Sequence, residues 1–134
     1  MTRRSRYGSL ALFENHKDIT MTILRINPEA RWSDAVIYNQ TLYYTGVPEN
    51  TDADALAQTA DILAQIDEML QAQGSDKTRI LDATIFLADR ADFALMNEAW
   101  DAWVAAGHAP VRCTVEAKLM KPQYKVEIKI IAAV

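Results

Sequence analysis

Two stretches near the C-terminus, residues 111–116 and 124–130, alternate apolar and polar side chains along most of their length. A period of two places successive side chains on opposite faces of a β-strand, so each stretch is predicted to form a half-buried strand. The apolar rows are Val111, Cys113 and Val115 in the first strand and Val126, Ile128 and Ile130 in the second. The chain is therefore expected to end in two strands of a sheet.

These two strands are predicted to pair as an antiparallel hairpin around residues 119–122. A register that sets Arg112 opposite Glu127 places both side chains on one face, because directly opposed residues share a face. The pattern leaves two interpretations open. The pair is an exposed ion pair of little energetic value, or the planar Arg112 guanidinium binds a carboxylate while Glu127 acts as a general base.

Hydrophobic periodicity predicts a β-hairpin and a helix in the first half of the chain. The hairpin covers residues 35–45, with its turn at residues 39–40. The helix runs to about Gln73 and is ended by Gly74, while Thr51 and Asp54 are spaced like a capping box at its start. One apolar stripe of this helix is formed by Leu56, Ala60, Leu63, Ile66 and Leu70.

A strand and a second helix follow. The strand at residues 80–88 is apolar on nearly both faces, which is typical of an interior strand covered by a helix or by another subunit. The second helix is expected to end at Gly107, with His108 near that end as a favourable cation or a loop residue rather than a catalytic base. Its apolar stripe, interpreted as core, is formed by Phe93, Met96, Trp100 and Trp103.

This order of elements predicts an α/β (α+β) sandwich, with two helices laid on one face of a four- or five-stranded mixed sheet. The opposite face would carry charged side chains together with apolar residues of the strand at 80–88. It would then be neither plain core nor plain solvent surface, and it is predicted to pack against other subunits. The polar residues assigned to it are Arg112, Thr114, Glu116, Lys125, Glu127 and Lys129.

Length, hydropathy and charge argue against a membrane-spanning protein and against a nucleic-acid-binding protein. At 134 residues the chain is one domain, and it lacks the roughly 18 consecutive apolar residues of a membrane span. Residues 1–20 are basic and irregular and are predicted to be a leader, irregular or not native, ahead of a single domain at residues 21–134. The formal charge of −4 leaves an acidic body, which disfavours a nucleic-acid surface.

The few cysteine and histidine residues argue against a disulfide and against a metal site. Cys113 is the single cysteine and is interpreted as a small buried apolar residue, so no intramolecular disulfide forms and a reducing cytoplasm is expected. His16 and His108 give no zinc-ligand spacing with it. We therefore predict neither a metal nor a cofactor.

Several motifs in order resemble the reactive-intermediate deaminase family, also called Rid or YjgF. The C-terminal signature consists of Ala109-Pro110-Val111-Arg112 and residues 126–132. The earlier motifs are Arg31-Trp32-Ser33, Tyr44-Thr45-Gly46, residues 82–87 and Met96-Asn97-Glu98-Ala99-Trp100. The similarity covers residues 21–134 and is greatest to the YoaB-like members.

The resemblance implies a chorismate-mutase-like fold assembled as a homotrimer, with the sheets forming a barrel and the sites lying between subunits. It also implies hydrolysis of 2-enamine and 2-imine acids, such as 2-iminopropanoate and 2-iminobutanoate, to 2-keto acids and ammonia. Arg112 would hold the substrate carboxylate, and Glu127 would position or activate water. The cleft would be lined by Trp32, Thr45, Gly46, Asn97, Cys113 and Thr114.

Two positions depart from the family pattern. Trp32 stands where many members have tyrosine, and Thr114 stands where they have cysteine, with Cys113 displaced by one residue. These changes are expected to leave carboxylate binding intact while altering substrate size or rate. The alternative to an enzyme is a non-catalytic trimer that binds small keto or amino acids, and nucleic-acid cleavage is disfavoured by the acidic body.

Overall fold

The computed structural model describes residues 22–134. The predicted leader at residues 1–20 lies outside these residues. The strands are β1 (Leu24–Pro28), β2 (Ser33–Tyr38), β3 (Thr41–Gly46), β4 (Ile80–Leu87), β5 (Val111–Glu116) and β6 (Val126–Ala133). The helices are α2 (Ala55–Ala72) and α3 (Phe93–Trp103), with short 3-10 turns η1 (Lys77–Arg79) and η2 (Arg90–Asp92).

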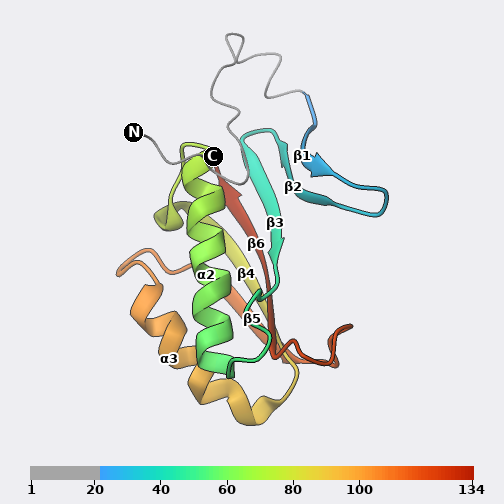
Figure 1. Ribbon diagram of the computed structural model, residues 1–134. Helices are drawn as coiled ribbons and strands as arrows, with labels where there is room; N and C mark the ends of the chain where they lie inside the picture. Colours follow the sequence, from blue (N-terminus) through green and yellow to red (C-terminus); the bar gives the residue numbers. More distant parts are fainter. Residues whose placement is uncertain (1–21) are drawn as a thin grey trace, which may run out of the picture.

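The strands form one mixed sheet in the order β1-β2-β3-β6-β4-β5, with β4 and β5 parallel and every other pair antiparallel. Both helices lie on the same face of this sheet (Figure 1). The predicted fold class is confirmed. The described sheet has six strands rather than four or five, because β1 is a short strand ending at Pro28 whose only buried side chain is Ile26.

The hairpin of β2 and β3 forms as predicted. Its turn residues Asn39 and Gln40 have φ of 52° and 58°, the left-handed conformation that a tight two-residue hairpin requires. Ala35 pairs with Tyr44 and Ile37 with Leu42, so these side chains share the face that packs against the helices. The hairpin thereby places the end of β3 beside β6.

The predicted hairpin of the last two strands is wrong. β6 lies between β3 and β4, whereas β5 pairs with β4 alone among the described strands. Ala83 of β4 opposes Arg112, but Phe86 opposes Glu127, and positions three apart on a strand point to opposite faces. Arg112 and Glu127 therefore do not share a face. Alternation fixes the two faces of a strand, but it does not identify the neighbouring strand.

Helix α2 begins and ends close to the predicted limits. Asp54 is its N-cap and its side chain accepts a hydrogen bond from the Ala57 N–H at 2.9 Å, so the expected cap at Thr51 is wrong by one turn. Gly74 is left-handed with φ of 73°, as predicted. Ala60 of the predicted stripe is exposed, because the buried face is centred instead on Ile62, Leu63, Ile66, Met69 and Leu70.

Helix α3 is shorter than predicted. It ends at Trp103, and Gly107 is left-handed but lies four residues later in a loop with the exposed His108. Met96 and Trp100 are buried against α2 and the sheet, which confirms that they belong to the core. Phe93 is exposed on the first turn, so it does not belong to the buried stripe.

The two sheet faces differ in cover. We call the side under α2 and α3 the covered face and the other side the open face. Val111 and Val115 are exposed on the open face, as is Cys113, so its predicted burial is wrong. The β5 pattern is inverted because this edge strand turns its polar row, Arg112 and Thr114, towards α3. Within residues 22–134 no helix combines the length and apolar character that crossing a membrane requires.

Candidate functional site

The predicted site residues fall into two groups on opposite faces of the sheet. The arginine cluster, on the covered face at the edge strand β5, consists of Arg112, Asn97, Trp100 and Thr114. The glutamate groove, a cavity of about 800 Å³, is reached from the other face of the sheet, where β2, β3 and the first half of β6 lie side by side. Its lining includes Trp32, Tyr43, Thr45, Met120, Tyr124, Glu127 and Lys129.

In the arginine cluster, α3 holds the guanidinium in place. Arg112 Nη1 donates a hydrogen bond to Asn97 Oδ1 at 2.8 Å, and its Cζ lies 5.3 Å from the centroid of the Trp100 ring. Asn97 and Trp100 stand one helical turn apart, so they reach the same neighbour. Among residues 22–134 no carboxylate pairs with Arg112, which excludes the ion pair with Glu127 there. Most of its five N–H donors are left for a ligand carboxylate.

Thr114 adds a second polar group two residues further along the same face. Its hydroxyl is buried and has no hydrogen-bond partner within the described part of the chain. It lines a second cavity of about 410 Å³ together with Leu87 and Phe93. A buried hydroxyl without a partner is costly, so a polar ligand atom would satisfy it.

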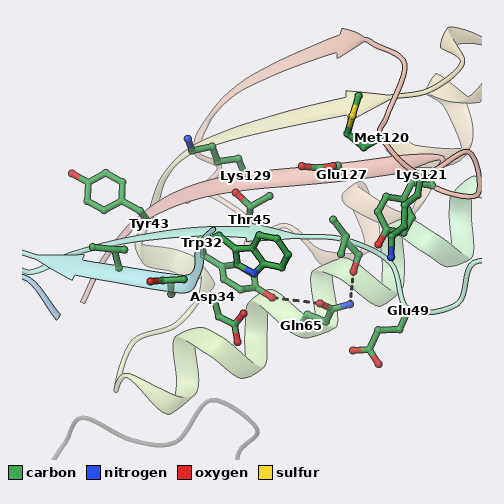
Figure 2. A pocket seen from close by; sticks show the side chains of 16 residues that line it. Trp32, Asp34, Tyr43, Thr45, Glu49, Gln65, Met120, Lys121, Glu127 and Lys129 are labelled. Atoms are coloured by element: carbon green, nitrogen blue, oxygen red, sulfur yellow. Dashed lines mark hydrogen bonds between the residues drawn. The ribbon is translucent and has the colours of Figure 1, made fainter. Parts of the chain in front are cut away.

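In the glutamate groove, the reactive candidate is Glu127. Its carboxylate is partly buried, and burial raises the pKa of Glu127 above the usual value for a glutamate by disfavouring the charged form. It makes no hydrogen bond or ion pair within residues 22–134. Figure 2 shows it above Thr45, with Lys129 further along β6. An unpaired carboxylate with a raised pKa is suited to take and return a proton.

The remaining predicted residues are Trp32, Thr45, Gly46 and Cys113, and only the first two line the groove. Trp32 is 65% exposed. Gly46 is buried, and a Cβ there would come within 2.8 Å of Ile62 Cγ2, so this glycine permits close packing of β3 on α2. Lining of a cleft by its backbone stays a prediction. Cys113 lies on the open face of β5, outside the groove lining.

Two buried glutamines of α2 were missed by sequence reasoning. Gln58 donates to the Gln123 carbonyl at 3.0 Å and accepts from the Lys125 N–H at 2.8 Å, which fixes the loop before Glu127. Gln65 donates to the Val47 carbonyl at 2.9 Å, which fixes the chain after β3. Their seven-residue spacing within an apolar stripe was the available signal, because buried polar side chains need partners.

The described residues contain no group of three or more histidine, cysteine, aspartate or glutamate side chains that could hold a metal ion. The free N–H donors of Arg112 are suited to recognise a carboxylate, and the partly buried Glu127 is suited to transfer a proton.

Comparison with known proteins agrees with this architecture. Residues 22–134 match the family described as Endoribonuclease L-PSP. The chain is 75% identical over 114 residues to the RutC family protein YoaB of Escherichia coli K12, covering 85% of this chain and all of that protein. It is 32% identical over 108 residues to Reactive Intermediate Deaminase A of Arabidopsis thaliana, covering 75% of this chain and 57% of that protein.

A solved structure gives the same result. A YjgF family member from Neisseria meningitidis superposes with a TM-score of 0.81 at 50% identity, covering 85% of this chain and 96% of that one. A six-stranded mixed sheet with two helices on one face is thus shared with this group. The chain belongs to the Endoribonuclease L-PSP family, which includes the YjgF and RutC proteins. The expected likeness to YoaB is confirmed.

Proposed function

We propose that the protein hydrolyses 2-imine and 2-enamine acids, of the 2-iminopropanoate and 2-iminobutanoate type, to 2-keto acids and ammonia without a cofactor. The observation that carries this proposal is the orientation of the Arg112 guanidinium, which contacts Asn97 and Trp100. Its remaining N–H donors are available to a substrate carboxylate. The relative named Reactive Intermediate Deaminase A supports the reaction class. We place the reaction in the cytoplasm, as expected for a chain with one cysteine.

The proposal requires a second subunit. Arg112 and Glu127 lie on opposite faces of one sheet, so a single chain cannot bring both to one small ligand. We therefore infer a homotrimer in which the arginine cluster at the β5 edge of one subunit faces the glutamate groove of the next. The exposed apolar side chains of the open face, such as Val111, support burial of that face on assembly.

The chemistry follows from the two groups. Arg112 binds the substrate carboxylate and fixes the imine carbon beside the water held at Glu127. Glu127 takes a proton as that water attacks C2 of the iminium, forming a C–O bond and a tetrahedral amino alcohol. Glu127 then returns the proton to the nitrogen and takes the hydroxyl proton, so that the C–N bond breaks as the C=O bond forms. The departing ammonia accepts that proton from Glu127 and leaves as ammonium. An enamine substrate first tautomerises to the imine.

The test couples the protein to a threonine dehydratase in the presence of semicarbazide, which traps the imine that escapes hydrolysis. Wild type should raise the fraction released as free keto acid. Arg112→Ala should lower kcat/KM about 10- to 150-fold, the value of a charge-assisted hydrogen bond of about 1.5–3 kcal/mol. Arg79→Ala, at an exposed position of η1, is the matched control. Wild-type rates in Arg112→Ala would refute the mechanism.

A second candidate function is non-catalytic binding of small keto or amino acids. It is favoured by one observation, since the arginine cluster is assembled within a single chain and needs no second subunit to hold a carboxylate. Calorimetric titration with 2-ketobutyrate separates the two functions. Saturable binding that depends on Arg112, without release of keto acid from the imine, would support the binding function.

A further inference from the structure

We propose that the glutamate groove selects 2-imino acids with a large apolar side chain, above all an aromatic one, over 2-iminopropanoate. This inference rests on the proposed hydrolysis, because it names the substrate class of the same site. Trp32, Tyr124 and Met120 are the residues that give the preference.

The groove is larger than a small imino acid requires. The groove has a volume of about 800 Å³, within the usual range of small-molecule pockets. A six-heavy-atom imino acid occupies roughly 180 Å³ if each heavy atom takes about the volume of one water molecule. Even if a neighbouring subunit fills half of the groove, the remaining space exceeds what 2-iminopropanoate requires. The extra volume suits a ring of six or more heavy atoms.

The walls of the groove carry large apolar and aromatic side chains. Trp32 is 65% exposed and Met120 is 92% exposed, an unusual state for two large apolar side chains on one groove. In Figure 2 they lie on different sides of Glu127, so a ligand at Glu127 would have an apolar side chain in either direction. Tyr124, carrying Lys121 Nζ at 5.6 Å from its ring centroid, adds a second aromatic surface. Such surfaces stack favourably on an aromatic ring.

The charge of the groove lining disfavours a second anionic group on the substrate. Three acids line the groove against two lysines, so its lining carries a net negative charge. A second carboxylate or a phosphate on the substrate side chain would therefore be repelled. The acids are Asp34, Glu49 and Glu127, and the lysines are Lys121 and Lys129. Neutral side chains remain, and among them the walls favour apolar ones.

The experiment compares two imines made in place by an L-amino acid oxidase, one from phenylalanine and one from alanine. Free keto acid is measured against semicarbazide trapping, with the full-length protein. Wild type should show a kcat/KM for the aromatic imine at least about tenfold above that for 2-iminopropanoate, a usual range for discrimination by an apolar pocket. A wild type that prefers the small imine would overturn the proposal, whereas hydrolysis of neither imine would refute the proposed function instead.

Two variants test the residues. Trp32→Ala should reduce the ratio of the two kcat/KM values about tenfold, mainly by raising KM for the aromatic imine. Met120→Ala should reduce it in the same direction, and folding is not at risk because this side chain is 92% exposed. Tyr38→Ala is the control, since Tyr38 is an exposed aromatic residue outside the groove lining.

Two outcomes would remove Trp32 and Met120 from substrate selection. An equal loss for both imines in both variants would mean that these side chains do not contact the substrate side chain. The other outcome is a change in the mass of Trp32→Ala measured by light scattering, while Met120→Ala leaves the ratio of the two kcat/KM values unchanged. That result would mean that these side chains contact a neighbouring subunit and not the substrate.

Discussion

The two faces of the sheet differ in how completely a single chain buries them. On the covered face, Leu42, Ile85 and Ile128 are fully buried under α2 and α3. On the open face, Tyr43 is 41% exposed and Val111 is 73% exposed, although both belong to regular strands. A single chain thus completes its hydrophobic core but leaves an apolar sheet surface uncovered within the described residues (Figure 1). The arginine cluster and the glutamate groove both lie at the border of this uncovered surface.

A charge at Val111 is expected to have the largest effect, because it tests whether the open face is buried between subunits. If the open face is buried between subunits, Val111→Asp places an unpaired charge in that interface, which costs several kcal/mol. The variant should keep its far-ultraviolet circular dichroism but run as a monomer in size exclusion with light scattering, and imine hydrolysis should be lost. Leu95→Asp, at an exposed position of α3, should leave assembly unchanged. A monomeric wild type would refute the inferred trimer.

The covered face should respond differently. Ile85→Ala removes a fully buried side chain from the middle of β4 and should lower the free energy of unfolding by about 2–5 kcal/mol. Urea denaturation followed by circular dichroism measures this loss. Leu95→Ala, at a site that is 37% exposed, should cost less, about 1 kcal/mol. Equal losses in the free energy of unfolding for the two variants would mean that Ile85 and Leu95 are equally buried in solution.

Much of this architecture could be predicted from local patterns. The β2–β3 hairpin follows from β-rich runs around a two-residue turn, and α2 from its apolar spacing and Gly74. The neighbour of β5 could not be read from alternation. The order strand, helix, strand at β4, α3 and β5 did carry that information, because a helical crossover joins parallel strands.

The candidate site was predicted less completely than the fold. Family motifs predicted Arg112, Asn97 and Glu127 as site residues, and a hydrogen bond joins the first two of them. The opposite orientation of Glu127 depends on the insertion of β6 between β3 and β4, a long-range pairing with no local signal. Gln58 and Gln65 were missed because an apolar-stripe analysis treats buried polar residues as gaps.

Gln58 links the two regions, since it reaches from the core helix to the loop before Glu127. Gln58→Leu would leave the Lys125 N–H and the Gln123 carbonyl without their partner, and it should lower stability by about 1–3 kcal/mol. Amide hydrogen exchange should become faster in the segment of residues 117–125. Gln71→Leu, at an exposed position of the same helix, is the control. Unchanged exchange would show that the loop is held by other contacts.

The smallest expected effect is a pH-dependent change in stability when Glu127 is replaced by glutamine. Burial raises the pKa of the Glu127 carboxyl in the folded protein above 4.5, its ordinary value in an unfolded chain, so between these two values the folded protein binds more protons than the unfolded chain. Stability contributed by this group is therefore present at low pH and is lost as the pH rises through the folded pKa. Glu127→Gln removes that loss, and its Tm relative to wild type should increase from pH 4 to pH 7.

The gain should be less than about 1 kcal/mol, because the group is partly exposed and solvent screens it. Differential scanning calorimetry across that pH range measures it, with Glu98→Gln on the exposed side of α3 as the control for the amide substitution. The same Glu127→Gln variant should lose imine hydrolysis, since an amide cannot take the proton from water. A Tm difference that falls as the pH rises would mean that Glu127 is stabilised as a carboxylate by a partner. The groove would then be a structural ion-pair site rather than a place for proton transfer.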